Sequence, residues 1–175
     1  MDTDFKALRL ALPLLLLLLV GGNGKAVEAG SANPQAFDLK VRADLLLKRG
    51  RLEPAISLYE KTIRRDPYFA NAYYNLATAY YLQGRFLKAA ENLEKFAALH
   101  PQDAETLYNL GCLKLKLGKI EEAKDCFSSA AGCPCNPQIS QKIKEALQFM
   151  KDLQSQTPEA QDLIAYLLTT SLKSL

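Results

Sequence analysis

A spacing of 34 residues recurs along the chain and limits the folds that it can adopt. Gly50, Gly84 and Gly118 are separated from one another by steps of 34 residues. Two further sets of small residues keep the same step, namely Ala55, Ala89 and Ala123, and Ala43, Ala77 and Gly111. A fixed period of this length is typical of stacked supersecondary units, so the sequence predicts a repeat protein and not a single closed core.

Each repeat contains two segments of helical length. Apolar residues recur at helical spacing on both sides of each glycine, which lies just after the first helix, where a left-handed backbone favours a residue without Cβ. Pro67 and Pro101 end the second helix of their repeats. Each repeat is therefore predicted to be a helical hairpin, and the fold class all-α. Counted from Ala36 without an insertion, the repeats span residues 36–69, 70–103 and 104–137.

The small, aromatic and proline positions of these hairpins resemble the tetratricopeptide repeat. The second repeat shows the pattern best, with Tyr73, Leu76, Ala77, Tyr80, Ala89, Leu93 and Pro101. Arg42 in the first repeat and Cys135 in the third depart from it, at positions where Leu and Pro are usual. The resemblance covers residues 36–137 and implies a right-handed superhelical solenoid of three hairpins. Alanine and glycine would let the two helices of a hairpin approach closely.

Two more helices are predicted after the repeats. In residues 138–153, apolar side chains alternate at helical spacing with Lys and Glu, as expected of a helix that caps a repeat array. Residues 157–175 open with Thr157 and Pro158, which are typical of a helix start, and are apolar over much of the helix. We expect this last helix to pack on the repeats; the alternatives are a partner-binding or membrane-contacting tail, and homo-oligomer formation.

The N-terminal residues have the pattern of an export signal. Lys6 and Arg9 precede the run from Leu10 to Val20, which contains no charge. The run is shorter than the roughly 18–20 residues that a membrane-spanning helix needs. We therefore predict that residues 1–24 are a signal peptide or, as the alternative, an uncleaved N-terminal membrane anchor, followed by a flexible linker over residues 25–35. The expected location is periplasmic or secreted.

The first helices of tetratricopeptide repeats line a concave groove in the family that the chain resembles. The resemblance implies a partner-binding groove that is aromatic and apolar in the middle and charged at its flanks. Tyrosine suits such a surface because it offers a large contact area with little rotamer entropy to lose. The candidate groove residues are Lys40, Leu47, Asn71, Tyr74, Thr78, Tyr81, Tyr108, Cys112 and Leu115.

One subtype of the family clamps the C-terminal carboxylate of chaperones. Of the residues that the subtype uses, Lys40 and Asn75 match, whereas Asp44, Glu105 and Asn109 do not. Two acidic side chains would repel a carboxylate, so the sequence argues against a chaperone-tail adaptor.

The four cysteines suggest a second function. Cys133 and Cys135 form a Cys-Pro-Cys motif after a helix, which could handle thiols or a metal with the repeats as a docking platform. Zinc needs four ligands in paired spacing, and the single histidine, His100, lies in another repeat. Cys112 and Cys126 are expected to pack as small apolar side chains. An export pathway would permit disulfides, with the pairing open among three arrangements.

Charge and composition argue against other classes of function. A net charge of +3 is too small for a nucleic-acid-binding surface. No arrangement of nucleophile and base indicates an enzyme, and no cofactor or metal is expected. The sequence therefore predicts a non-catalytic scaffold that binds a peptide or protein in the groove, in the setting of an envelope complex.

Overall fold

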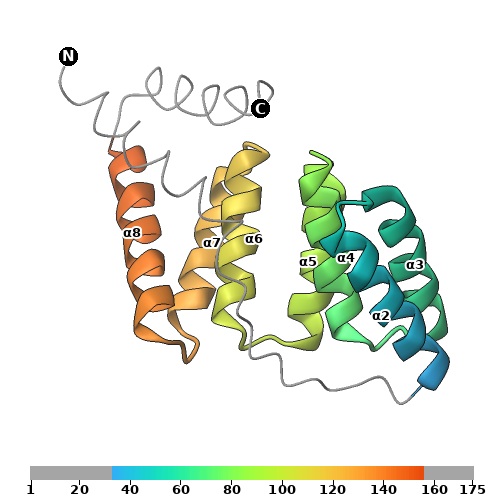
Figure 1. Ribbon diagram of the computed structural model, residues 1–175. Coiled ribbons are helices and arrows are strands. Elements are labelled where there is room, and N and C mark those ends of the chain that lie inside the picture. The colour runs from blue at the N-terminus through green and yellow to red at the C-terminus, as the bar shows by residue number, and fades with distance from the viewer. Residues whose placement is uncertain (1–32, 156–175) are drawn as a thin grey trace. The chain divides into compact units, whose positions relative to one another are not determined.

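The computed structural model describes residues 33–155, which form helices and short connections without a strand. The helices are α2 (Pro34–Lys48), α3 (Leu52–Arg65), α4 (Ala70–Leu82), α5 (Phe86–Leu99), α6 (Ala104–Lys116), α7 (Ile120–Ala131) and α8 (Pro137–Gln154) (Figure 1). The chain divides into two compact units, one of which contains α2–α5 within residues 25–101, while the other contains α6–α8.

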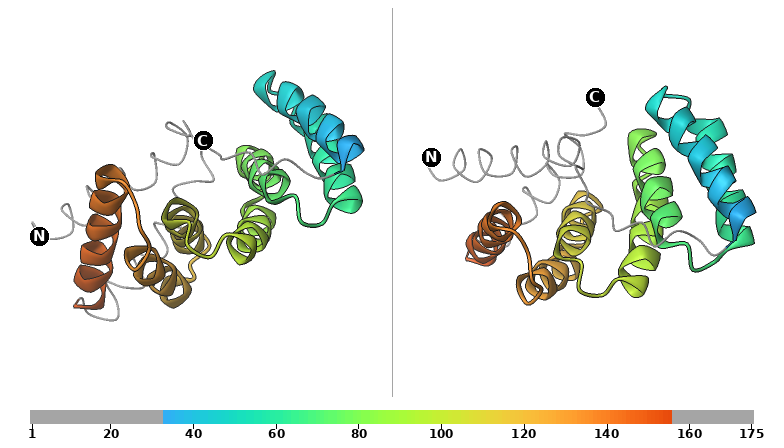
Figure 2. Two further views of the ribbon diagram at one scale, coloured as in Figure 1. Left: turned by 90° about the horizontal axis from the view of Figure 1, so that it is seen from below. Right: turned by 60° about the horizontal axis from the view of Figure 1, so that its bottom comes forward.

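Consecutive helices pair as hairpins within each unit. In the first unit α2 packs against α3, α4 packs against α5, and α3 joins the two hairpins by packing against α4 (Figures 1 and 2). In the second unit α6 packs against α7, and α8 packs against α7 with a smaller contact to α6. The prediction of an all-α fold made of helical hairpins is confirmed.

A glycine ends the first helix of each hairpin by adopting a left-handed conformation. The φ angles are +69° at Gly50, +72° at Gly84 and +74° at Gly118. At Gly84 this conformation lets two backbone N–H groups close the end of α4: Gly84 N donates to Tyr81 O at 2.9 Å, and Arg85 N donates to Tyr80 O at 2.9 Å. The expected role of the 34-residue glycine period is therefore confirmed.

Small residues bring the two helices of a hairpin into close contact. Ala43 and Ala77 are 0% and 2% exposed. At Gly111 on α6, an added Cβ would lie 2.5 Å from a ring carbon of Phe127 on α7. Phe127 is itself fully buried, so the absence of a side chain at residue 111 makes room for its ring.

The start of α2 differs from the predicted end of the linker. The helix begins at Pro34, so residues 34–35 belong to α2 and not to the linker. The Asn33 side chain caps this end by accepting from Gln35 N at 3.0 Å and Ala36 N at 3.2 Å. An Asn cap followed by proline at the first helical position explains the earlier start.

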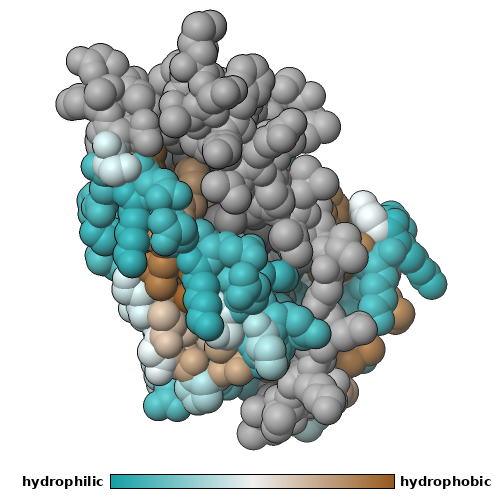
Figure 3. Space-filling model, turned by 90° about the vertical axis from the view of Figure 1, so that its left-hand side faces the viewer, coloured by the Kyte–Doolittle hydropathy of each residue, from teal (hydrophilic) through white to brown (hydrophobic). Residues whose placement is uncertain are grey.

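The predicted capping helix corresponds to α8. Its apolar side chains are buried in a cluster with α6 and α7, whereas Lys144, Glu145, Gln148 and Lys151 are exposed. Figure 3, viewed from the side of α8, shows a largely hydrophilic surface with smaller apolar areas between. The buried residues of α8 are Ile139, Ile143, Ala146, Phe149, Met150 and Leu153.

Several predictions fall outside the described residues. These concern the signal peptide or anchor at 1–24, the linker at 25–32 and the last helix at 157–175. None of the helices between residues 33 and 155 is long and apolar enough to cross a bilayer.

Candidate partner-binding site

One face of α4 carries most of the predicted groove residues of the first unit. Asn71, Tyr74, Thr78 and Tyr81 are spaced by three or four residues, so their side chains share one side of the helix. All four are partly exposed. On its other sides α4 is held by buried residues of the hairpin core, namely Ala72, Leu76, Ala77, Ala79 and Tyr80. The candidate face is therefore part of a helix fixed by packing.

Aromatic contacts hold the two tyrosine rings of this face. Tyr74 meets Phe96 of α5 edge to face, with ring centroids 5.3 Å apart, and Phe96 in turn lies 4.9 Å from the His100 ring. Tyr81 makes a similar edge-to-face contact with Phe86 at 5.4 Å. Rings supported in this way lose little additional freedom when a partner binds.

The other predicted groove residues of the first unit lie on α2. Lys40 and Leu47 are partly exposed, and Asp44 lies between them on the same side of the helix. Asn75 of α4 donates to Asp44 Oδ1 at 2.8 Å and so links this side of α2 to α4. The structure thus brings the candidate residues of α2 and α4 into one neighbourhood. We call Lys40, Leu47, Asn71, Tyr74, Thr78 and Tyr81 the α2–α4 face.

Asp44 collects donors from three helices. Its Oδ2 pairs with Lys40 Nζ at 2.9 Å, and its Oδ1 accepts from Tyr59 of α3 at 2.7 Å as well as from Asn75. Burial and the hydrogen bond to Asp44 raise the pKa of Tyr59 well above its usual value, so the phenol remains a donor. The two residues that match the carboxylate-clamp subtype, Lys40 and Asn75, are therefore both used by a carboxylate of the chain itself.

The predicted groove residues of the third repeat are not accessible. Tyr108, Cys112 and Leu115 on α6 are 3%, 3% and 2% exposed. They belong to the cluster that the apolar residues of α7 and α8 complete, and the Tyr108 ring lies 5.7 Å from that of Phe127. The expectation that Tyr108 offers free surface to a partner is wrong in this structure, because α6 is packed where the sequence predicted a groove.

Burial also makes Cys112 unreactive. Loss of water around the thiol raises its pKa to about 12, so the thiolate is rare near neutral pH. The expectation that Cys112 packs as a small apolar side chain is confirmed.

Cys133 and Cys135 differ in their surroundings. Cys133 is partly buried and its Sγ lies 3.4 Å from Ser129 O, whereas Cys135 is exposed. Within residues 33–155, no group of three or more His, Cys, Asp or Glu side chains could hold a metal ion. The thiol or metal function stays a prediction without a described ligand set.

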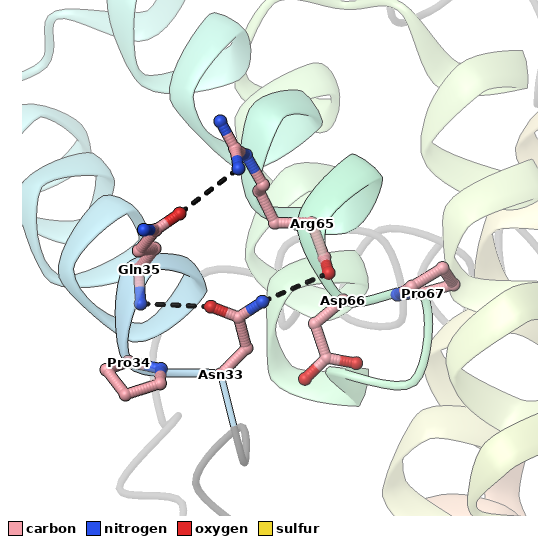
Figure 4. Close-up of a pocket in the computed structure, with 6 residues that line it drawn as sticks. All are labelled: Asn33, Pro34, Gln35, Arg65, Asp66 and Pro67. Atoms are coloured by element: carbon pink, nitrogen blue, oxygen red, sulfur yellow. Dashed lines mark hydrogen bonds between the residues drawn. The ribbon is translucent and has the colours of Figure 1, made fainter.

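A hollow of about 670 Å³ lies where the start of α2 meets the end of α3 (Figure 4). Its polar groups bind one another: Arg65 donates to Gln35 Oε1 at 3.1 Å, and Asn33 Nδ2 donates to Arg65 O at 3.4 Å. These hydrogen bonds link the start of α2 to the end of α3. None of the predicted groove residues lines the hollow.

Sequence reasoning missed the role of Asp44 and Tyr59 as one cluster. The four-residue spacing of Lys40 and Asp44 was a visible signal of an ion pair. The contact with Tyr59, 15 residues later on another helix, has no local pattern in the sequence.

Comparisons with known proteins place these features in a wider class. Residues 48–130 match the family model "Anaphase-promoting complex, cyclosome, subunit 3". The chain is 32% identical to "DnaJ homolog subfamily C member 3" of Gallus gallus over 156 aligned residues. The aligned part is 89% of this chain and 30% of the relative. The chain is 28% identical to the "Heat-shock protein cognate (HSC) co-chaperone sgt12" of Aspergillus fumigatus over 57% of this chain and 29% of the relative. The chain therefore spans less than a third of the length of these relatives.

Two solved structures share the hairpin architecture. The "P58(IPK) TPR Domain" superimposes with a TM-score of 0.64 at 26% identity, over 78% of this chain and 39% of that chain. The "First TPR of Spaghetti (RPAP3) bound to HSP90 peptide SRMEEVD" has a TM-score of 0.57 at 26% identity, over 66% of this chain and 93% of that chain. The helical hairpins, the small residues at the contacts between their helices and these similarities assign the chain to a class of protein-interaction module. The chain belongs to the tetratricopeptide repeat family.

Proposed function

We propose that the chain is a non-catalytic scaffold that binds a peptide or protein segment on the α2–α4 face. The observation that carries this proposal is the partly exposed set of Tyr74, Thr78 and Tyr81, two of whose rings are held by neighbouring rings. This set lies beside the polar cluster that Asp44 forms with Lys40, Tyr59 and Asn75. Tyrosines that are held by neighbouring rings supply contact area at a low entropic cost, which is a property of binding hot spots.

The polar cluster around Asp44 is evidence against a ligand that is held through a terminal carboxylate. Lys40 and Asn75 already donate to Asp44, and a second carboxylate would meet the negative charge of the first. The solved relative with 26% identity binds an HSP90 peptide, which makes this the main competing function. We therefore propose that the ligand contributes apolar and aromatic side chains, and that it lies along α4.

Peptide binding separates these two functions. The peptide SRMEEVD is tested with a free and with an amidated C-terminus by fluorescence anisotropy. We expect no difference between the two forms, because the donors for a carboxylate are occupied. Tighter binding of the free acid by roughly tenfold, equivalent to about 1.4 kcal/mol, would identify a carboxylate clamp and contradict the proposal.

Affinity capture followed by mass spectrometry tests the α2–α4 face itself. We expect Tyr74→Ala combined with Tyr81→Ala to lose the partners that the wild type captures. Tyr68→Ala is the matched control, because Tyr68 is 82% exposed and lies in the connection between α3 and α4. Equal capture by wild type and double variant, with unchanged far-ultraviolet circular dichroism, would rule out this face.

We further propose that the chain is exported and contributes to the assembly of an envelope complex. The apolar run from Leu10 to Val20 after Lys6 and Arg9 supports export, with a retained N-terminal anchor as the alternative. Cell fractionation and mass measurement of the native N-terminus test this point. A full-length chain in the soluble cytoplasmic fraction would contradict both forms of the proposal.

A further inference from the structure

An apolar stripe runs along the exposed side of α2. Phe37, Val41 and Leu45 are spaced by four residues, so they follow one another on the helix surface. They are 41%, 39% and 49% exposed, whereas Ala36 and Ala43, on the opposite side of the helix, are fully buried. We call Phe37, Val41 and Leu45 the α2 stripe.

The α2 stripe is unusual for a helix at the end of a hairpin stack. α2 belongs to the first hairpin of the first unit and lies at one end of it (Figures 1 and 2). End helices of repeat arrays need a polar outer face, because no further repeat covers them. α8, the capping helix of the second unit, has such a face, with Lys144, Gln148 and Lys151 exposed. The exposed side of α2 is apolar along its middle instead, so it suits contact with another apolar surface.

The charges beside the α2 stripe are complementary to themselves. Asp38 and Arg42 follow Phe37 and Val41 by one residue, so both lie along the same edge of the stripe. They form an ion pair at 3.7 Å within the helix, and their side chains are 68% and 62% exposed. Such an exposed pair contributes little stability, so it can exchange partners at little cost. The charge along this edge is negative at residue 38 and positive at residue 42, and it therefore matches an identical edge that runs in the opposite direction.

We propose that the α2 stripe binds the α2 stripe of a second copy of the chain, with the two α2 helices antiparallel about a two-fold axis near Val41. Val41 then meets Val41 of the second copy, and Phe37 lies beside Leu45 of the second copy. The same edges of the two antiparallel helices face each other, so Asp38 reaches Arg42 of the second copy. The two-fold symmetry makes each of these contacts twice.

The area of the α2 stripe sets the strength of the association. One face of a 15-residue helix is about 22 Å long and about 10 Å wide. This is far below the roughly 800 Å² that each partner buries in a stable interface, so the dimer is weak and forms at high protein concentration.

Charge identifies the occupant of the stripe. The occupant must present an apolar row with a positive and then a negative side chain along its edge, and α2 of a second copy meets both conditions. The inference is independent of the proposed α2–α4 face, because no residue of the α2 stripe belongs to that face.

Sedimentation velocity of the full chain, in low-salt buffer with reductant to keep the cysteines free, tests the inference from about 10 µM to about 1 mM protein. We expect the average mass to rise from that of a monomer toward that of a dimer over this range. Val41→Lys places two like charges at the centre of the contact and should raise the dissociation constant at least about tenfold. Leu87→Lys is the matched control and should leave it unchanged, because Leu87 is a 56% exposed leucine on α5.

Charge reversal tests the antiparallel arrangement. Asp38→Arg makes the edge of the stripe positive at both positions, and Arg42→Asp makes it negative at both. Each variant alone should therefore associate at least about fivefold more weakly than the wild type. An equimolar mixture of the two variants restores opposite charges across both contacts and should associate as tightly as the wild type. Recovery in the mixture also shows that both variants are folded.

Three results would overturn the inference. One is a wild-type chain that stays monomeric up to about 1 mM. Another is an association that Val41→Lys does not weaken, which would assign the contact to a different surface. The third is a mixture of Asp38→Arg and Arg42→Asp that associates no more tightly than either variant alone.

Discussion

Replacing Asp44 by alanine should destabilise the first unit more than any other change to a partly exposed charge there. The substitution removes the acceptor of three donors on three helices: Lys40 on α2, Tyr59 on α3 and Asn75 on α4. Tyr59 is 0% exposed, so water cannot easily replace the lost carboxylate at its hydroxyl. The loss should therefore be measurable as a fall in the free energy of unfolding.

The contacts give the size of the effect. Leaving the Tyr59 hydroxyl without its charged acceptor costs about 2 kcal/mol. Lys40 and Asn75 lie closer to solvent, and together their lost interactions add about 1 kcal/mol. We expect Asp44→Ala to lower the free energy of unfolding by about 3 kcal/mol, which is a large part of the total for a domain of this size. Asp38→Ala, which breaks the exposed pair with Arg42, should cost less than about 0.5 kcal/mol.

A double-mutant cycle in urea denaturation, followed by circular dichroism, isolates the buried contact. Tyr59→Phe removes the hydroxyl but keeps the ring, so in its background Asp44→Ala should cost about 1–2 kcal/mol less than in the wild type. If Asp44→Ala costs no more than Asp38→Ala, or if the two substitutions at 44 and 59 are additive, the cluster does not join the three helices as described.

Three further predictions concern residues of the repeat framework. Gly84→Ala places a Cβ on a backbone with φ of +72° and should lower the free energy of unfolding by about 1 kcal/mol in thermal or urea denaturation, whereas no loss would contradict the left-handed helix end. Gly111→Ala should cost about 1–2 kcal/mol despite the better helix propensity of alanine, because the added Cβ lies 2.5 Å from the buried Phe127 ring; a stabilised variant would show that the ring can move. Cys112, with its pKa raised to about 12, should remain unreactive toward a thiol reagent in the folded protein at pH 8 while the exposed Cys135 reacts, and equal rates would contradict the burial of α6.

The sequence predicted the hairpins because their signals are local. The glycine period marks the helix ends, and each glycine needs its left-handed conformation for reasons confined to one turn of backbone. Small residues at the helix contacts act over one hairpin, as Gly111 and Phe127 show. These features depend on residues that lie within about one repeat of each other, so a single sequence reveals them.

The candidate site was predicted only in part, because exposure depends on contacts between hairpins and the helix that follows. Tyr74 and Tyr108 occupy the same position of their repeats, yet Tyr74 is partly exposed while Tyr108 is 3% exposed. The difference arises because Tyr108 lies in the core of α6, α7 and α8. The repeat pattern gives both residues the same role, and only the packing around each separates them.

The Asp44 cluster connects stability with the choice of ligand. A carboxylate that joins three helices through Lys40, Tyr59 and Asn75 cannot also leave these donors available to a ligand. Removing Asp44 to free them would leave the buried Tyr59 hydroxyl unpaired and weaken the fold that holds the face in place. If the α2–α4 face binds the ligand as proposed, its selectivity should therefore depend on Tyr74, Tyr81 and the shape of α4, where contact area does not compete with the interactions that stabilise the first unit.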